Sequence, residues 1–226
     1  MPTLQPNSSP GNLLERANFG LHDAIEARVV SAFSREARIL DVGCGTGAWL
    51  SRLAQRGFFN LSGVDLNVDQ SRSSGLRVDC VNLDAPNWPA VAGGFDLITC
   101  IEVFEHIENP GQFLGNLANL LAPGGELLLT SPNVESLASR LRFLATGSLK
   151  QFDHLGDATH ITPLFSYTFP KLLARKGLRI AERWSFPEGH RTLTSRSWVN
   201  WVTRALRIVI AEPVGGDNVC MRIVRV

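Results

Sequence analysis

Two carboxylates and an imidazole stand close together near the middle of the chain, at Glu102, Glu105 and His106. Their spacing of i, i+3 and i+4 places all three side chains on one face if the segment forms a helical turn. An imidazole beside a carboxylate can remove a proton from a hydroxyl group, so we expect His106 and Glu105 to be catalytic. The same three groups can instead hold a divalent cation, and a purely structural cluster is the third interpretation.

A glycine-rich loop follows a short apolar run at residues 39–42. The run predicts a buried strand, and Gly43 and Gly45 lack the Cβ atom that would keep the backbone away from a ligand. A helix over residues 48–55 would point its N-terminal amides at that ligand. Asp65 ends the next apolar run and has two oxygens for the hydroxyls of a ribose, although a helix cap is the plainer role. The arrangement predicts a nucleoside pocket.

The acid before the glycines helps to distinguish between cofactors. Gly43, Gly45 and Ala48 satisfy the Gly-x-Gly-x-x-Ala pattern of dinucleotide sites. Asp41, however, would repel a pyrophosphate and would attract a cationic ammonium or sulfonium group. The loop therefore favours S-adenosylmethionine, and a nicotinamide dinucleotide remains the alternative.

Apolar runs predict the strands that position these groups. They lie at residues 39–42, 61–65, 76–81, 95–101, 126–130, 178–186 and 219–226. Helical patterns are found at residues 13–33, 48–55, 109–121 and 167–176. Strands that alternate with helices predict a parallel sheet covered on both faces. In such a sheet, ligands bind beyond the carboxyl ends of the strands.

Four segments, in the order in which they occur, resemble those of class I S-adenosylmethionine-dependent methyltransferases. They are residues 40–47, 63–65, 95–106 and 121–127. The resemblance is closest to the ubiquinone-pathway O-methyltransferases. It implies an α/β fold with a Rossmann-like, doubly wound sheet of seven mostly parallel strands, helices on both faces and an antiparallel last strand. It also implies methylation of a small-molecule hydroxyl, such as that of a phenol or quinone precursor, a sugar or a natural product, with S-adenosylhomocysteine as the second product.

The resemblance assigns the cofactor pocket to the ends of the first four strands. The residues are Asp41, Gly43, Cys44, Gly45, Asp65, Leu66, Asn82, Leu83, Ile101 and Glu102. Asp41 would bind the methionyl part, and Leu66 would lie against the adenine face. The family usually has an acid where this chain has Asn82, which still offers an oxygen to the adenine amino group. Asp79 and Asp84 are the alternatives for that contact.

A more distant resemblance, to small-RNA 3′-end 2′-O-methyltransferases, implies a metal site that a downstream histidine completes. In this chain the site would consist of Glu102, Glu105, His106 and His160, with His154 as a weaker candidate. The same Glu-Val-x-Glu-His pattern occurs in methyltransferases without a known metal. A metal-free base at His106 therefore stays open beside the divalent cation.

A chain of 226 residues fits one domain, which we place over residues 1–226. Within it, residues 1–10 are expected to form a mobile tail and residues 11–35 an N-terminal lid or packing helix. Two segments interrupt the alternation of strands and helices, at residues 134–163 and 187–216. Loops at the ligand end of such a sheet differ between enzymes, so both segments are expected to lie on the substrate side.

Composition argues against several classes of protein. The net charge of +1 gives no general attraction to nucleic acid, which disfavours methylation of an RNA terminus.

The cysteines and the apolar stretches bear on where the protein is found. Four cysteines, Cys44, Cys80, Cys100 and Cys220, are far apart in the sequence, so we expect them to be reduced core residues. No apolar stretch reaches the roughly 20 residues that span a bilayer, and no export signal is evident, so we expect a cytoplasmic protein. A cofactor-binding partner subunit without activity is a further alternative.

An amphipathic helical pattern occupies the second interrupting segment. Its apolar side consists of Trp198, Trp201, Val202, Ala205, Leu206, Val209 and Ile210, and its polar side of Asn200, Thr203, Arg204 and Arg207. A helix packed on the sheet is the plain interpretation. A hydrophobic substrate wall, a homodimer interface and a helix at a membrane surface are the others. Both segments suit an apolar or lipid-linked acceptor.

Overall fold

The computed structural model describes residues 15, 17–68, 76–88, 91–188, 192–193, 197–210 and 215–226. The tail predicted at residues 1–10 and the side chain of Trp198 lie outside this part of the chain.

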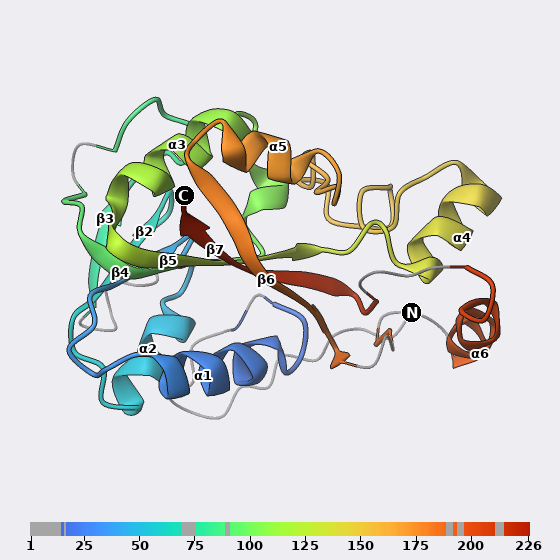
Figure 1. Ribbon diagram of the computed structural model, residues 1–226, viewed down its shortest axis with the longest axis horizontal. Helices are drawn as coiled ribbons and strands as arrows, with labels where there is room; N and C mark the ends of the chain where they lie inside the picture. The colour runs from blue at the N-terminus through green and yellow to red at the C-terminus, as the bar shows by residue number, and fades with distance from the viewer. Residues whose placement is uncertain are drawn as a thin grey trace.

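Seven strands form one sheet in the order β3-β2-β1-β4-β5-β7-β6. They are β1 (Ile39–Val42), β2 (Leu61–Asp65), β3 (Arg77–Cys80), β4 (Phe95–Ile101), β5 (Leu121–Pro132), β6 (Leu178–Phe186) and β7 (Asn218–Arg225). Neighbouring strands from β3 to β5 run parallel, whereas β7 runs antiparallel to both β5 and β6. The predicted Rossmann-like sheet with an antiparallel last strand is confirmed (Figure 1).

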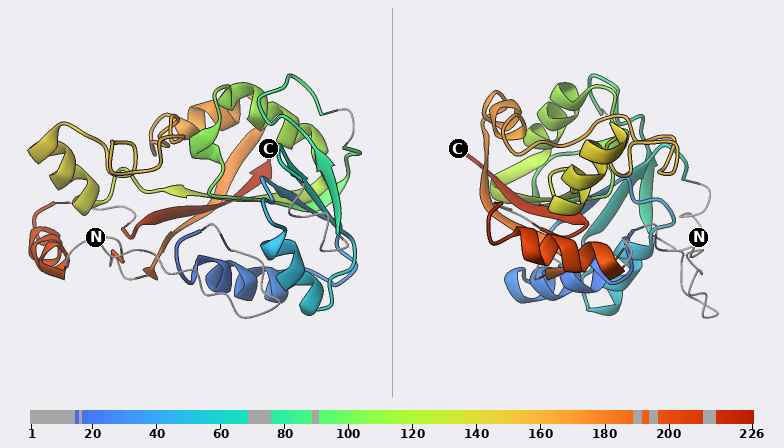
Figure 2. Two further views of the ribbon diagram at one scale, coloured as in Figure 1. Left: turned by 180° about the vertical axis from the view of Figure 1, so that it is seen from behind. Right: turned by 90° about the vertical axis from the view of Figure 1, so that its right-hand side faces the viewer.

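Helices cover both faces of the sheet (Figures 1 and 2). On one face lie α1 (Leu21–Ala32) and α2 (Ala48–Gln55), and on the other lie α3 (Pro110–Leu120) and α5 (Phe169–Ala174). The chain thus enters α2 directly from the glycine loop that follows β1, as the sequence predicted.

The central strands bury both of their faces. Ile39 and Leu97 point into the core on the α1 and α2 side, whereas Leu40 and Ile98 point into the core on the α3 and α5 side. Successive side chains of a strand point to opposite faces, so a strand covered on both sides is apolar throughout. This is why unbroken apolar runs marked β1 and β4 in the sequence.

Two further helices lie together at one end of the molecule, away from the sheet (Figures 1 and 2). They are α4 (Leu137–Thr146) and α6 (Ser197–Leu206). Ser136 caps α4, since its hydroxyl oxygen accepts a hydrogen bond from the Ser139 amide. Because α6 packs against α4, the prediction that it packs on the sheet is wrong.

Three local predictions need correction. The first helix begins at Leu21 instead of residue 13, because Gly20 turns the chain with φ +82°. Strand β5 extends well beyond the predicted residues 126–130 in both directions. All four cysteines are free, but Cys80 on the edge strand β3 is exposed instead of forming part of the core.

None of the described helices is both long enough and apolar enough to cross a membrane. The cytoplasmic location remains a prediction.

Candidate functional site

A cavity of about 860 Å³ lies where the glycine loop, the ends of β2 and β4 and residues 151–160 meet. The strand order places the two central strands β1 and β4 side by side, with their connections leaving in opposite directions, which is where open α/β sheets bind ligands. The predicted site residues that line the cavity are Asp41, Gly43, Cys44, Gly45, Asp65, Leu66, Leu83, Ile101, Glu102, Glu105, His106 and His160. Residues far apart in the sequence therefore meet around one space.

The glycine loop packs tightly against Val103 and is held by Asp65. A Cβ atom on Gly43 would come within 2.4 Å of the Val103 side chain, and both Gly43 and Gly45 have positive φ angles, of 72° and 52°. Asp65 holds the loop, because its Oδ2 accepts a hydrogen bond of 2.8 Å from the Gly45 amide. Its Oδ1 accepts one of 2.9 Å from the Asn67 amide. Each oxygen keeps a second lone pair for a ligand.

Asp41 is buried at the end of β1. Its Oδ1 accepts a hydrogen bond of 2.8 Å from the Thr99 hydroxyl, which in turn accepts one of 3.1 Å from the Trp49 indole. Burial raises the pKa of Asp41 to about 7, the hydrogen bond from Thr99 opposes this shift, and the nearby charge of Asp65 adds to it. A cationic ligand in the cavity would stabilise the ionised form of Asp41.

Glu102 does not share a face with Glu105 and His106, so that prediction is wrong. Its φ of +55° takes the chain out of the helical conformation, and the short 3-10 turn η2 (Phe104–His106) begins only afterwards. The Glu102 carboxylate turns toward the sheet, where it accepts hydrogen bonds from the Thr130 hydroxyl at 2.9 Å and the Asn218 amide at 2.5 Å. Burial raises its pKa to about 7 despite these bonds.

The Glu105 side chain is fully buried, and only one of its two carboxylate oxygens accepts a hydrogen bond from the described residues. Its Oε2 accepts a hydrogen bond of 3.2 Å from the Ser131 hydroxyl, whereas Oε1 has no hydrogen-bond partner among the described residues. Burial, with the charge of Glu102 nearby, holds the pKa of this carboxyl well above its usual range. A buried carboxylate oxygen without a partner is costly unless a ligand supplies one.

The contacts of His106 determine its tautomer. Its Nδ1 lies 2.8 Å from the hydroxyl oxygen of Thr159 and 3.3 Å from the carbonyl oxygen of the same residue. The Thr159 hydroxyl gives its proton to Asp157 at 2.6 Å, and a carbonyl oxygen only accepts. Nδ1 of His106 therefore carries the proton, and Nε2 has a free lone pair. Burial and then the neighbouring His160 lower the pKa of His106, which keeps the imidazole neutral.

His160 is held in the same way. Its Nδ1 donates a hydrogen bond of 2.9 Å to the carbonyl oxygen of Gln151, so Nε2 is the nitrogen without a proton in the neutral form of this ring. The His106 and His160 rings lie edge to face with centroids 4.8 Å apart. One ligand atom from each of Glu105, His106 and His160 lies within 4.8 Å of the others. Neither Glu102 nor His154 belongs to this group.

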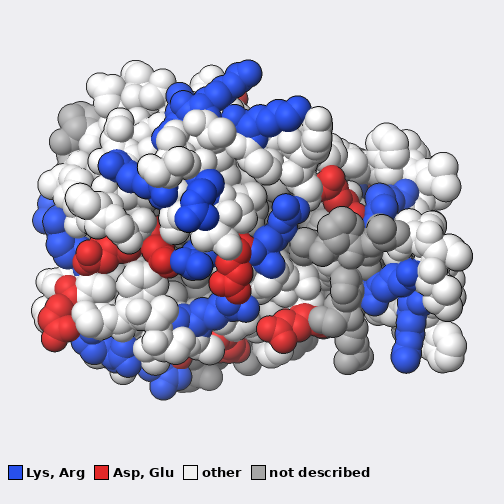
Figure 3. Space-filling model, viewed as in Figure 1, with Lys and Arg blue, Asp and Glu red and all other residues white. Residues whose placement is uncertain are grey.

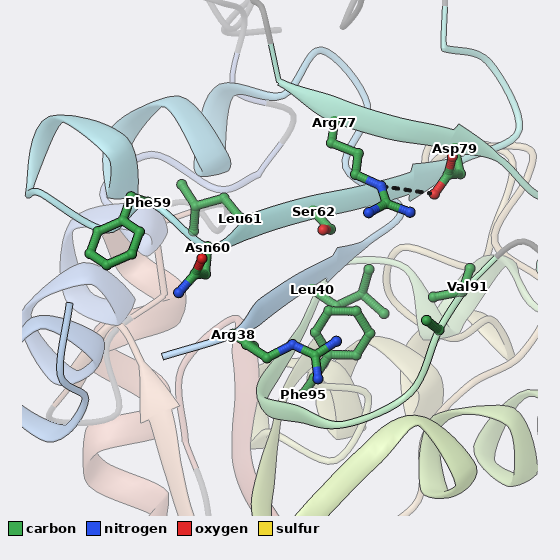
Figure 4. Close-up of a pocket in the computed structure, with 11 residues that line it drawn as sticks. Arg38, Leu40, Phe59, Asn60, Leu61, Ser62, Arg77, Asp79, Val91 and Phe95 are labelled. Carbon is green, nitrogen blue, oxygen red and sulfur yellow. Dashed lines mark ion pairs between the residues drawn. The ribbon is translucent and has the colours of Figure 1, made fainter. Parts of the chain in front are cut away.

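Asn82 lies away from the cavity, since its exposed side chain accepts a hydrogen bond of 3.0 Å from the Asp84 amide. The Asp84 carboxylate accepts a hydrogen bond of 2.8 Å from the Asn109 backbone amide. Asp79 pairs with Arg77 at 3.8 Å beside a second cavity, of about 340 Å³, near the amino ends of β1, β2 and β4 (Figure 4). None of these three side chains is among the described residues that line the first cavity, and the adenine contact of Asn82 stays a prediction.

Several residues of the site were not predicted. Thr159, Asp157 and Gln151 orient the two histidines, and they belong to a loop whose contact with His106 spans 53 positions in the sequence. The Asp-x-Thr spacing at 157–159 is a turn signal, but nothing local indicates its partner. His22 of α1 also lines the cavity, where its buried ring lies 5.6 Å from that of Trp49.

The N-terminal segment is fastened over the cavity by ion pairs. Arg52 of α2 pairs with Glu15 at 2.6 Å, with Glu26 at 2.9 Å and with Asp23. The neighbouring His22 imidazole and the hydrogen bond from Arg52 lower the pKa of Glu15 to about 2. Glu15 and Asn18 both line the cavity, and the lid at residues 11–35 stays a prediction.

Comparison with known proteins identifies the family. A family model described as a methyltransferase domain matches residues 14–205. The ubiquinone biosynthesis O-methyltransferase of Saccharophagus degradans is 33% identical over 106 residues, which cover 43% of this chain and 44% of the relative. That of Xanthomonas axonopodis pv. citri is 36% identical over 105 residues, with the same coverage. The match thus spans less than half of the length of these curated relatives.

Solved structures share the fold at low sequence identity. A methyltransferase from Archaeoglobus fulgidus described as dependent on S-adenosylmethionine has a TM-score of 0.58 at 19% identity, covering 89% of this chain and 93% of that one. The magnesium protoporphyrin IX methyltransferase of Synechocystis, with S-adenosylhomocysteine bound, has a TM-score of 0.60 at 19% identity, covering 91% and 82%.

Proposed function

The chain belongs to the methyltransferase-domain family, and on that premise we propose that it transfers the methyl group of S-adenosylmethionine to a hydroxyl oxygen of a small molecule. The observation that carries this proposal is the pair of hydrogen bonds at Nδ1 of His106, which leaves the Nε2 lone pair free at the cavity. A neutral imidazole with a free nitrogen is the group that can accept a hydroxyl proton near neutral pH.

The cofactor would lie across the carboxyl ends of β1 and β2. Asp65 would accept the ribose hydroxyls through its remaining lone pairs, while Gly43 and Gly45 line the amino-acid end. The ammonium group of the methionyl part would lie near Asp41 and favour its ionised form. Leu66 and Leu83 also line the cavity and would contact the adenine, and the Leu83 amide would donate a hydrogen bond to the adenine ring.

The reaction requires alignment and one proton transfer. The acceptor oxygen attacks the methyl carbon from the side opposite the sulfonium, so that an oxygen–carbon bond forms while the sulfur–carbon bond breaks. The hydroxyl proton moves to Nε2 of His106, and S-adenosylhomocysteine and a methyl ether result. Asp157 lies behind Thr159 and would stabilise the imidazolium ion that forms, since its charge favours the protonated ring. The proton then passes to solvent.

A second proposal for the same site is a divalent cation. Two imidazole nitrogens and a carboxylate oxygen, within 4.8 Å of one another, are a donor set that suits zinc, manganese or iron. The fit is good because Oε1 of Glu105 lacks a partner among the described residues and both Nε2 atoms are unprotonated in the neutral rings. A bound cation would lower the pKa of an acceptor hydroxyl, and His106 would then be a ligand instead of the base.

The acceptor we propose is a small molecule with an apolar or lipid-linked body. The cavity continues past His160 to Leu155, which is 62% exposed at its rim, and the ring of Phe152 lies 5.4 Å from that of His160. The curated relatives are named for ubiquinone biosynthesis, which favours a phenolic acceptor over a sugar.

Methyl-labelled S-adenosylmethionine, supplied with a panel of catechols, single phenols, sugars and an RNA oligonucleotide, tests this proposal. We expect label on the oxygen of a phenolic acceptor, and loss of that product with His106→Ala. Transfer to RNA instead, or cofactor binding without transfer to any acceptor in the panel or in a small-molecule extract, would contradict it.

A further inference from the structure

Large apolar side chains lie exposed on the two helices that stand away from the sheet. Leu144 of α4 is 84% exposed, and Trp201 of α6 is 79% exposed. Ile208 and Val209, in the turn that follows α6, are 88% and 79% exposed. We call these four residues, with Arg140 and Arg204, the α4/α6 surface. An exposed apolar patch formed by adjacent helices marks a place of contact with another body.

The orientation of α6 is the reverse of that of a helix packed on a core. Two of its polar residues face inward. Thr203 is 2% exposed, and the Asn200 side-chain amide donates a hydrogen bond of 3.1 Å to the Thr192 carbonyl oxygen and accepts one of 3.0 Å from the Thr192 amide. The apolar stripe that includes Trp201 and Val202 faces outward. The predicted amphipathic pattern is therefore present, and Trp201, Ile208 and Val209 on its apolar side are largely exposed.

The charge on these elements has one sign. Residues 136–150 and 197–210 contain five basic residues and no Asp or Glu, although the whole chain has 22 basic and 21 acidic residues. Asp153 pairs with Arg142, and Asp217 pairs with Lys150. The side chains of Arg140 and Arg204 are exposed. The end of the molecule that carries α4 and α6 shows basic and uncharged atoms (Figure 3).

We propose that the α4/α6 surface docks on an anionic lipid bilayer. Apolar side chains bordered by arginines suit the boundary between acyl chains and anionic headgroups, where tryptophan is also favoured. Two helices of 10 residues each are too short to cross the bilayer and would lie along it. This inference stands on exposure and charge and does not depend on the methyl-transfer reaction.

A second copy of the chain fits this surface less well. A two-fold interface brings the same patch of both subunits together, so the basic residues of α4 and α6 in one copy would face those of the other. An anionic bilayer offers the opposite charge. Residues 151–160 follow α4 and line the cavity, so docking would also bring the cavity rim near the headgroups.

Co-sedimentation with lipid vesicles tests the proposal. We expect the full chain, saturated with S-adenosylhomocysteine, to bind vesicles of equal parts phosphatidylcholine and phosphatidylglycerol and to bind pure phosphatidylcholine about tenfold less tightly. Trp201→Ser combined with Ile208→Ser should reduce the partition coefficient for the mixed vesicles by about tenfold or more. Arg140→Gln with Arg204→Gln should remove most of the preference for the mixed vesicles.

Matched controls lie elsewhere on the surface. Phe59→Ser removes a side chain that is 65% exposed beside the second cavity, and Arg175→Gln with Arg179→Gln removes two exposed cations near β6. Both should bind vesicles as the unaltered chain does, and unchanged S-adenosylhomocysteine affinity shows that each variant is folded. Equal vesicle binding by the Trp201/Ile208 variant, or no binding by the unaltered chain, would overturn the proposal. So would a dimer that the same variant dissociates while vesicles have no effect.

Discussion

Nδ1 of His106 lies 2.8 Å from the hydroxyl oxygen of Thr159, and this contact determines which nitrogen of the imidazole is free at the cavity. Thr159 can accept the proton of Nδ1 only because its own proton goes to Asp157. The hydrogen bonds that join His106, Thr159 and Asp157 thus leave the Nε2 lone pair of His106 available to accept a proton or to bind a cation. The predictions below follow from this arrangement and from the glycine loop opposite it.

His106→Ala should reduce the rate of methyl transfer by about 100-fold or more, because either a general base or a metal ligand is lost. The affinity for S-adenosylhomocysteine should change little, since the ring is not part of the glycine loop. Rates from single-turnover experiments and affinities from calorimetry would be compared. His154→Ala is the control, because that histidine is exposed and lies outside the cluster. Unchanged turnover in His106→Ala would remove the residue from the mechanism.

Asp65→Ala should weaken S-adenosylhomocysteine binding by about 100-fold, since it removes the proposed ribose contacts together with the hydrogen bond that holds the Gly45 amide. The fold should survive, because Asp65 is at the end of β2 and only partly buried. Calorimetry gives the affinity, and circular dichroism the fold. Asp79→Ala, beside the other cavity, should bind as the unaltered chain does. An affinity that survives in Asp65→Ala would contradict the proposed position of the ribose.

Asp41→Asn should stabilise the cofactor-free protein at neutral and alkaline pH. Burial raises the pKa of Asp41 from 3.8 to about 7, so the native state favours the protonated form. The contribution of Asp41 to the free energy of unfolding is therefore most favourable below pH 3.8, falls as pH rises toward 7 and stays low above it. Asparagine lacks this penalty, so the difference between the two proteins should grow over that range to at most about 4 kcal/mol.

Urea unfolding at a series of pH values measures this difference. The Asp41 variant should also bind S-adenosylhomocysteine more weakly, so stability and cofactor affinity should change in opposite directions. A stability difference that stays constant with pH would show that Asp41 is ionised in the native state.

Calorimetric titration of zinc, manganese and magnesium, each separately, into protein saturated with S-adenosylhomocysteine tests the cation proposal. We expect a site that Glu105→Gln and His160→Ala each abolish, because both supply a ligand atom to the group. Glu102→Gln should retain it, since that carboxylate is engaged with Thr130 and Asn218. If no cation binds the unaltered chain, His106 acts as a metal-free base. If Glu102→Gln alone abolishes binding, the ligand set inferred from the geometry is wrong.

The sequence predicted the parts of the fold in which neighbouring residues share one environment. β1 and β4 are buried on both faces, so their apolar runs marked them, and the glycine loop after β1 is continuous in the sequence. Glu102 was misplaced because its spacing to His106 fits a helix, whereas its left-handed backbone directs the carboxylate to the sheet. A positive φ in a glutamate has no signature in the neighbouring residues.

The rest of the site depends on contacts between distant segments. Thr159 reaches His106 across 53 positions, and Asn82 was assigned by its place after β3 although its side chain turns to Asp84. The apolar stripe of α6 was found from its period, but the period does not indicate whether that side faces a core or solvent. The orientation of α6 follows instead from the burial of Thr203 and from the hydrogen bonds of Asn200.

The most direct test of the central claim is the protonation of the two ring nitrogens of His106, measured by long-range ¹H–¹⁵N correlation spectra of the protein with S-adenosylhomocysteine bound. His106→Gln assigns the signals. We predict a proton on Nδ1 and none on Nε2 at neutral pH, with a pKa below the usual 6.5, and a shift toward the Nε2-protonated form in Thr159→Val. A ring that carries its proton on Nε2 at neutral pH, or that stays protonated on both nitrogens above pH 6.5, would contradict the proposed base and the proposed metal ligand alike.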